Sequence, residues 1–266
     1  MLMKSKKGVI LGVANHRSIA WGIFESLRNQ GAEITLTYMN DRMKDGIEKL
    51  FKKFDITDVE LLECDVTKQE TIDSTFNTLG DKYGKIDFVV HCLAFADKSE
   101  LEGNFIDTSR NGFAMANDVS AFSLVAVAKA AEPFLSESAA ITSLTYLGSE
   151  RICMNYNVMG VAKAALECST RYLAGDLGPK GIRVNTVSAG PVNTLAARGI
   201  SGFTRMMTIQ EKISPLRRIN TIEEIGNSVM FLSSDLSSGI TGEVIHVDCG
   251  FSNVGVGPIE AYNLEK

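Results

Sequence analysis

Two tyrosines and one lysine have the residue types and the spacing that could perform chemistry. Tyr156 and Lys163 are seven residues apart, and seven residues of an α-helix turn through about 700°, so both side chains share one face, about 10 Å apart. Tyr146 lies ten residues upstream, at the end of a predicted strand. A tyrosine hydroxyl can donate a hydrogen bond to a carbonyl oxygen that gains negative charge, and a lysine ammonium can hold the hydroxyls of a ribose. Alternatively, Tyr156 is an ordinary aromatic residue at a helix cap and Lys163 is a solvated surface charge.

A small-residue turn follows the first predicted strand. Gly12 and Gly22 are ten residues apart, with Ser18-Ile19-Ala20 between them. Backbone N–H groups in such a turn can approach a pyrophosphate, and the dipole of the following helix favours its negative charge. The usual G-x-G-x-x-G pattern is absent, so a plain turn at Gly12 and close helix packing at Gly22 remain the alternative.

Residues after the second and third strands could contact the rest of a dinucleotide. An acidic residue after the second strand favours NAD and a basic one accommodates the 2′-phosphate of NADP. Met39 is neither, while Asp41 and Arg42, slightly further on, point to opposite answers. Asp65, after the third strand, could accept a hydrogen bond from the adenine amino group. Alternatively, Asp65 caps a helix, a role that Thr67 could fill equally well.

The elements that would position these residues alternate along the chain. Seven strands separated by helices imply a parallel sheet with helices on both faces, and right-handed crossovers favour a Rossmann-like, doubly wound α/β fold. We expect one domain, 1–266, with ligands bound beyond the carboxyl ends of the strands. Thr221 and Glu224 predict a capping box. The predicted strands are 9–11, 33–38, 59–62, 88–92, 139–144, 182–187 and 243–247, and the predicted helices are 19–30, 43–54, 71–82, 117–135, 157–177 and 221–232.

Composition excludes several classes of protein. The chain has 266 residues, 45% hydrophobic and 22% charged, with a net charge of −5, which is ordinary for a globular enzyme-sized domain. The basic residues are scattered, so no nucleic-acid partner is expected. No apolar run reaches membrane-spanning length, and the N-terminus lacks the features of a signal peptide. Five cysteines without C-x-x-C and three histidines without ligand spacing predict neither a disulfide frame nor a metal site. The cytoplasm is the expected compartment.

The first turn, the alternating strands and helices and the Tyr156–Lys163 motif occur in the order found in short-chain dehydrogenases/reductases, which the chain therefore resembles. It departs from the usual Tyr-x-x-x-Lys pair of that family. Met159 stands four residues before Lys163 and cannot act as an acid, whereas Tyr156 gives Tyr-x6-Lys. That spacing, together with the upstream Tyr146, resembles the divergent enoyl-acyl-carrier-protein reductases of type II fatty acid synthesis, which use NADH. The resemblance covers essentially the whole chain and continues through Arg183-Val-Asn, Ser188-Ala-Gly-Pro191, Thr194-Leu-Ala-Ala197, Gly239-Ile-Thr-Gly242 and His246-Val-Asp.

The resemblance implies a role for each matching position. Tyr146, Tyr156 and Lys163 would be catalytic, and Tyr146, Tyr156 and the Ala96 backbone would face the substrate. Lys163 would also hold the nicotinamide ribose. Met39 would bind the cofactor on the adenosine side, at the position where a Gln is common in NADH-using members, and it cannot make the hydrogen bonds of that Gln. The remaining cofactor-binding positions would be Gly12, Ser18, Ile19, Asp65, Val66, Leu93, Val192, Asn193, Thr194, Leu195 and Ala196.

The implied reaction is the reduction of a trans-2-enoyl thioester carried on acyl carrier protein, the last reductive step of fatty acid elongation. NADH is the expected cofactor, and NADPH is the less favoured one. The resemblance also implies a homotetramer and a substrate lid over about 195–205, where Gly199, Ser201 and Gly202 are small. The tail, 255–266, has no pattern to which a function can be assigned.

Two other functions fit parts of the sequence. A carbonyl reductase acting on 3-oxoacyl groups would share the fold and the cofactor, but Met159 in the usual tyrosine position disfavours it. A non-catalytic dinucleotide sensor would bind the cofactor without turnover, and the joint presence of Tyr146, Tyr156 and Lys163 disfavours that reading.

Overall fold

The computed structural model describes residues 1–194 and 202–258. Seven parallel strands form one sheet in the order β3-β2-β1-β4-β5-β6-β7, so the strand order reverses between β1 and β4. The Rossmann-like prediction is confirmed. The strands are β1 (Lys7–Leu11), β2 (Glu33–Tyr38), β3 (Glu60–Glu63), β4 (Ile86–His91), β5 (Leu135–Thr145), β6 (Arg183–Ala189) and β7 (Val244–Val247).

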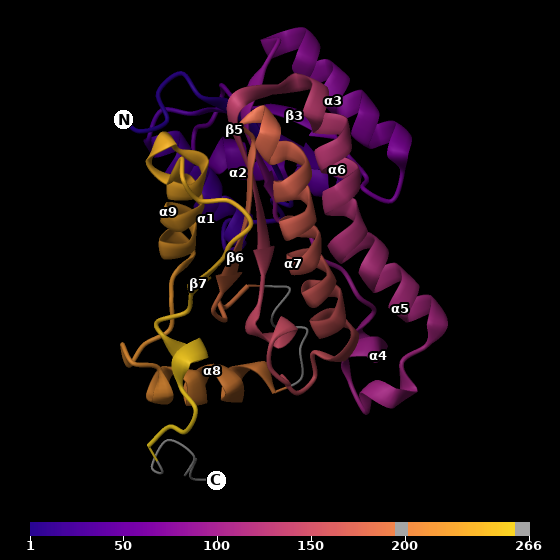
Figure 1. Ribbon diagram of the computed structural model, residues 1–266, viewed down its shortest axis with the longest axis vertical. Helices are drawn as coiled ribbons and strands as arrows, with labels where there is room; N and C mark the ends of the chain where they lie inside the picture. The colour runs from indigo at the N-terminus through magenta and orange to yellow at the C-terminus, as the bar shows by residue number, and fades with distance from the viewer. Residues whose placement is uncertain (195–201, 259–266) are drawn as a thin grey trace.

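Helices cover both faces of this sheet, as Figure 1 shows. One face carries α1 (Ile19–Asn29), α2 (Asp41–Lys53) and α9 (Ile222–Ser233). The other carries α3 (Gln69–Tyr83), α6 (Ser123–Ala131) and α7 (Asn157–Leu177). At the carboxyl ends of the strands lie α4 (Lys98–Leu101), α5 (Arg110–Asn117) and α8 (Phe203–Ile213).

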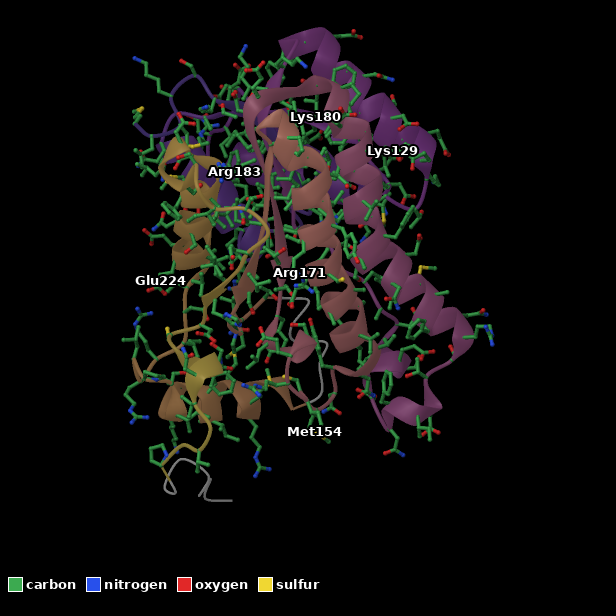
Figure 2. The ribbon with its side chains drawn as sticks, in the orientation of Figure 1. Lys129, Met154, Arg171, Lys180, Arg183 and Glu224 are labelled. Carbon is green, nitrogen blue, oxygen red and sulfur yellow. The ribbon has the colours of Figure 1, made fainter. Side chains whose placement is uncertain are left out.

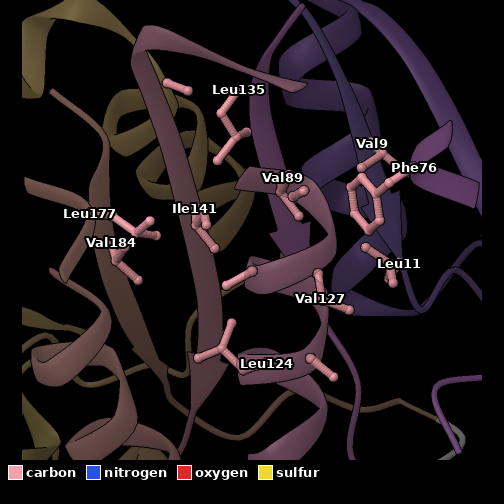
Figure 3. Close-up of a cluster of buried hydrophobic side chains, with 14 of the residues drawn as sticks. Val9, Leu11, Phe76, Val89, Leu124, Val127, Leu135, Ile141, Leu177 and Val184 are labelled. Atoms are coloured by element: carbon pink, nitrogen blue, oxygen red, sulfur yellow. The ribbon is translucent and has the colours of Figure 1, made fainter. Parts of the chain in front are cut away.

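Each face of the sheet buries its own apolar cluster. Phe76 on α3 and Val127 on α6 pack on one face against strand residues such as Val89 and Ile141 (Figure 3). Trp21 and Phe24 from α1 fill the other. Because strand residues alternate between the two faces, both sets must be apolar, and β1 and β4 read as nearly continuous apolar runs. The two clusters fix the sheet whose edge carries the site.

Two predicted boundaries are wrong, and one helix was not predicted. The predicted helix 117–135 begins at Arg110 and contains a π-helical turn, Asp118–Phe122, between α5 and α6. Strand β5 begins at Leu135, four residues early, because Leu135 pairs with Ile86 before a register shift. Helix α8 was not predicted, since its sequence lies where we expected the end of a lid and then irregular chain.

Glycines bring α1 against α9. A Cβ on Gly22 would lie 2.5 Å from the carbonyl oxygen of Ile222, and one on Gly226 would lie 2.4 Å from that of Gly22. The close-packing role considered for Gly22 is therefore confirmed. The predicted capping box is also present: Thr221 Oγ1 accepts from the Glu224 N–H at 3.2 Å, and a Glu224 carboxylate oxygen accepts from the Thr221 N–H at 2.9 Å.

One helical stretch of the described residues, Arg110–Phe134, is long and apolar enough to span a membrane by length and composition alone. Half of its apolar window is buried in the protein. Its α6 part packs on the sheet in the cluster around Val127, which is how the core helix of a globular protein is placed.

Candidate active site

Tyr156 occupies the N-cap position of α7, where the backbone is held in an unusual conformation. Its two neighbours, Asn155 and Asn157, have φ values of 60° and 32°, in the left-handed region that non-glycine residues seldom adopt. The ring lies against Gly148, because a Cβ there would lie 2.4 Å from a Tyr156 ring carbon. A Cβ on Gly160 would in turn approach the Gly148 carbonyl to 2.6 Å. Two glycines thus let the turn after β5 close onto α7 and seat the tyrosine ring.

The second predicted tyrosine lies directly beside the first. The rings of Tyr146 and Tyr156 are 5.0 Å apart between centroids and meet edge to face at 69°. The Tyr146 hydroxyl lies 3.6 Å from Met206 Sδ on α8. Burial raises the pKa of both tyrosines, and Cys153 raises each further. Both hydroxyls therefore stay protonated near neutral pH and remain hydrogen-bond donors.

Lys163 lies two turns into α7, on the face turned to the sheet. It is 5% exposed, and its ammonium donates to the carbonyl oxygen of Leu144 at 2.7 Å, near the end of β5. Burial lowers its pKa to about 8, while Cys92 and Glu167 oppose that shift. Among the described residues no carboxylate lies within 4 Å of this ammonium, so part of its hydrogen-bonding capacity is left for a ligand.

Glu167, one turn after Lys163, is a buried polar residue that the sequence analysis did not select. It is 7% exposed, and its Oε1 accepts a 2.5 Å hydrogen bond from Thr145 Oγ1, at the last residue of β5. A spacing of four residues from Lys163 places both on the same helix face. That spacing was visible in the sequence, but a lone glutamate on a helix is usually solvated.

The π-helical turn and the first residue of α6 supply two serines, Ser120 and Ser123, near the end of β4. Ser120 Oγ accepts from the Phe95 N–H at 3.0 Å and donates to the Phe95 carbonyl at 3.1 Å, which fixes the backbone next to Ala96. Ser123 Oγ lies 2.7 Å from His91 Nε2. Burial lowers the pKa of His91 to about 3, and Lys163 contributes, so this imidazole is neutral. π turns often occur at functional sites.

The first turn has the backbone geometry expected for a phosphate site. Gly12 has φ +104°, and a Cβ there would lie 2.0 Å from the Cys92 carbonyl and 3.2 Å from Leu93. Gly12 and Leu93, both predicted to bind the cofactor, are thus brought together. Ser18 is the N-cap of α1, accepts from the Trp21 N–H at 3.3 Å and donates to the Asn15 carbonyl at 2.7 Å. Ile19 is the first residue of that helix.

The residues predicted for the adenosine side differ in how firmly they are held. Met39 follows β2 and is 47% exposed. The Asp65 carboxylate is buried and accepts from the Thr67 N–H at 3.1 Å and hydroxyl at 2.7 Å. Burial alone would raise its pKa, but Thr67 and the nearby Lys68 outweigh that effect and lower it. Neither Asp65 nor Thr67 caps α3, because its N-cap is Lys68. Val66 is half-buried against the cluster containing Phe76.

The segment after β6 is described in part. Val192 packs against the cluster around Trp21, and the Thr194 N–H donates to the Val192 carbonyl at 2.7 Å. Asn193 between them is exposed. Leu195 and Ala196, and with them most of the predicted lid, lie outside the described residues. The described end of that range, from Gly202 on, leads into α8.

These residues fit a nicotinamide dinucleotide. The N-terminus of α1 and the close backbone approach at Gly12 suit a pyrophosphate. The buried ammonium of Lys163, with a single described acceptor, suits the hydroxyls of a ribose. The turn follows β1, which flanks the reversal in strand order, and Lys163 bonds Leu144 near the carboxyl end of β5, two strands away. Such folds bind their ligands at this edge of the sheet.

Two exposed apolar side chains lie in the segment between β5 and α7. Met154 projects from the segment between β5 and α7, at the same end of the molecule as α8 (Figure 2). Met154 and Ile152, in the segment that links Tyr146 to Tyr156, are both exposed. Exposed apolar side chains in this segment suit a substrate with a hydrocarbon part.

Comparisons with known proteins find relatives over nearly the whole chain. Residues 12–252 match the family model described as enoyl-(acyl carrier protein) reductase. The chain is 52% identical to enoyl-[acyl-carrier-protein] reductase [NADH] 1 of Rhizobium meliloti, over 99% of this chain and 96% of that one. It is 45% identical to the NADH-dependent enoyl-[acyl-carrier-protein] reductase of Escherichia coli, over 97% and 98%.

Solved structures give the same result. An enoyl-(acyl-carrier-protein) reductase from Anaplasma phagocytophilum in complex with NAD matches with a TM-score of 0.93 and 46% identity, over 97% of this chain and 98% of that one. The Bacillus cereus enoyl-acyl carrier protein reductase with NADP+ and indole naphthyridinone matches with a TM-score of 0.93 and 49% identity, over 96% and 99%. The chain belongs to the enoyl-(acyl carrier protein) reductase family.

Proposed function

We propose that this protein reduces trans-2-enoyl thioesters to saturated acyl thioesters with NADH, as the last reductive step of fatty acid elongation. The family assignment supports the reaction, and relatives named for NADH support the cofactor. The observation that carries the proposal is the pairing of a protonated Tyr156 with a buried Lys163 at the carboxyl edge of the sheet.

Tyr156 would act on the thioester oxygen. NADH, when bound, supplies the hydride that the β-carbon receives, and negative charge then develops on that oxygen. The Tyr156 hydroxyl donates a hydrogen bond there, in a partly water-excluded setting where such a bond is worth more than in water. The edge-to-face contact with Tyr146 holds the ring in place, and Tyr146 belongs to the site without being assigned as the proton donor.

The Tyr-x6-Lys spacing fits an enoyl substrate. A carbonyl reductase must protonate the oxygen bonded to the carbon that receives hydride, so its tyrosine stands close to that carbon. In an enoyl thioester the carbon that receives hydride is two bonds from the carbonyl carbon. A donor at the start of α7 stands further along the substrate, while Met159, in the position of a carbonyl reductase tyrosine, is buried and apolar.

The test is the absorbance at 340 nm with purified protein and crotonyl-CoA, with NADH and NADPH run in parallel. Loss of absorbance that depends on the enoyl thioester, faster with NADH, is the expected result. Oxidation with acetoacetyl-CoA alone would establish the carbonyl reductase instead. Cofactor binding without turnover of either substrate, or of a longer enoyl chain on acyl carrier protein, would establish the sensor.

The natural substrate would be delivered by acyl carrier protein, as the names of the relatives imply. We place the reaction in the cytoplasm, in keeping with five cysteines that are all free thiols, without a membrane or nucleic-acid partner. A higher kcat/KM for crotonyl-acyl carrier protein than for crotonyl-CoA is the expected result. Equal values would remove the carrier protein from the proposal.

We also propose that the protein is a homotetramer. A groove of about 420 Å³ on the outer face of α6 and α7 is lined by Val125, Ala165 and Leu173, and Tyr172 beside it is 74% exposed. Apolar surface of this kind marks interfaces, and most soluble oligomers are symmetric assemblies of one chain. Light scattering should give four times the chain mass, and Tyr172→Glu should lower it. A monomeric mass for the unaltered protein would contradict the assembly.

A further inference from the structure

The face of α7 that packs on the sheet carries a polar stripe. Lys163, Glu167 and Thr170 recur at positions i, i+4 and i+7, and all three are buried. Each one bonds a strand residue: Lys163 the Leu144 carbonyl, Glu167 the Thr145 hydroxyl and Thr170 the Thr186 hydroxyl. A helix face turned to a sheet is ordinarily apolar. The proposed function gives a role to Lys163 but none to Glu167.

Burying a carboxylate is costly unless its charge is compensated. Glu167 accepts a hydrogen bond from Thr145 at 2.5 Å, and among the described residues no ammonium or guanidinium lies within 4 Å of it. The nearest buried cation along its own helix face is Lys163, one turn away. Two opposite charges held a turn apart in a poorly hydrated region still attract, because screening there is weak.

The other titratable groups around Lys163 are neutral. His91 at the end of β4 has its pKa lowered to about 3 by burial and by Lys163. Burial raises the pKa of Cys92 to about 12, so it is still a thiol when Lys163 titrates. Tyr156 is protonated because burial raises its pKa. Strands β5 and β6 and the start of α6 contribute hydroxyls, from Ser143, Thr186 and Ser123. Among the described residues, Glu167 is thus the carboxylate whose charge acts on Lys163.

We propose that Glu167 is a positioning residue that keeps the Lys163 ammonium charged and fixes the end of β5 just before Tyr146. The inference rests on the proposed function, in which charged Lys163 holds the cofactor ribose. Lys163 and Glu167 bond two consecutive strand residues, Leu144 and Thr145, so one helix turn sets both the cation and the strand end. Without the carboxylate, one of the two groups that oppose the effect of burial on the pKa of Lys163 would be lost.

The test measures the NADH dissociation constant by fluorescence at pH 6.5, 7.5 and 8.5, which requires no turnover. Glu167→Gln keeps the size of the side chain and a hydrogen-bond acceptor. In this variant we expect a near-normal NADH dissociation constant at pH 6.5. At pH 8.5 the dissociation constant should rise about tenfold for each unit by which the pKa of Lys163 falls. Glu167→Asp, which keeps the charge, should restore the unaltered pH profile. Glu167→Met is a second neutral variant and should move the profile in the same direction.

Thr170→Val is the matched control, because it removes the next polar group of the same stripe without removing charge. It should lower Tm and leave the pH profile of NADH binding unchanged. An unshifted profile in Glu167→Gln, or an equal loss of affinity at every pH, would overturn the inference. Lys163→Met separates the two proposals: unchanged NADH affinity in that variant contradicts the role of Lys163, whereas weakened affinity with an unshifted Glu167→Gln profile contradicts only the role of Glu167.

Discussion

The two ends of the candidate active site present different kinds of groups to a ligand. At β1 and β2, the predicted cofactor contacts are backbone groups and an exposed side chain: the Gly12 turn, the N-terminus of α1 and Met39. At β5 and α7, they are buried side chains tied to strand ends, namely Lys163, Glu167 and the tyrosine pair. The first end recognises a ligand by shape, and the second by chemistry. Substitutions should therefore act differently at the two ends.

The largest effect is expected at the chemical end, in Tyr156→Phe. Loss of a donor to a developing oxyanion commonly lowers kcat by about 10²–10³-fold, and NADH affinity should stay near normal because the ring remains. Steady-state kinetics with crotonyl-CoA and fluorescence titration measure the two quantities. Tyr83→Phe, on α3, is the control and should be nearly silent. Normal turnover in Tyr156→Phe would contradict the proposed role.

Cofactor affinity should depend on pH through Lys163. Its pKa is lowered to about 8 by burial, so the ammonium is charged below that pH and binds ribose, and it loses its proton as the pH rises further. NADH affinity should hold up to about pH 8 and then fall. In Lys163→Met we expect NADH affinity to be about ten- to a hundredfold lower below pH 8, since a hydrogen bond from a charged group is removed. Above pH 8 the NADH affinity of this variant should not change with pH. A wild-type affinity that is constant from pH 7 to 10 would exclude this dependence.

At the backbone end, Gly12→Ala should act through geometry. The added Cβ would lie 2.0 Å from the Cys92 carbonyl at a φ of +104°, so the turn must shift, at a cost of about 1–3 kcal/mol in stability. Thermal unfolding and NADH titration should both show the change. Gly175→Ala is the opposite case, because that site on α7 has nothing within 4 Å, and Tm should rise slightly. Equal stabilities for the two variants would mean that the turn relaxes freely.

The smallest effect is expected at Met39. Its side chain is 47% exposed after β2, where a basic residue can accommodate a 2′-phosphate. Because exposed charge pairs contribute about 0.2–1 kcal/mol, Met39→Arg should improve kcat/KM for NADPH relative to NADH by no more than about fivefold. Met39→Leu serves as the neutral control. A larger gain would show that this end selects its ligand by side-chain chemistry after all.

The sheet and the chemical end were predictable from sequence because each has a local signature. Apolar runs alternating with helical patterns predicted every strand. The shared helix face of Tyr156 and Lys163 stays a prediction, because Tyr156 is the N-cap of α7 and the φ of Asn157 is 32°. Asp65 was placed correctly after β3 but not as a helix cap, since α3 starts at Gln69 and its N-cap, Lys68, lies three residues after Asp65. Helix α8 was missed although Phe203, Met206 and Met207 lie at helical spacing, because its start overlaps the predicted lid.

Glu167 could not be selected because its importance depends on what covers it. A glutamate four residues after a lysine usually forms a solvated pair, and nothing local distinguishes a buried face from an exposed one. The same is true of Ser120 and Ser123, whose partners Phe95 and His91 are 25 and 32 residues away in the chain. Long-range contacts of this kind need the tertiary structure.

The π turn between α5 and α6 makes this stretch sensitive to chain length. A π turn holds one more residue than an α turn, and each residue of an α-helix rotates the next by about 100°. Deleting any one residue of Asp118–Phe122 would restore a regular helix and rotate one end against the other. Ser120 and Ser123 could not then both keep their partners at the end of β4. Relatives can therefore differ in residue type along this helix more readily than in the number of its residues.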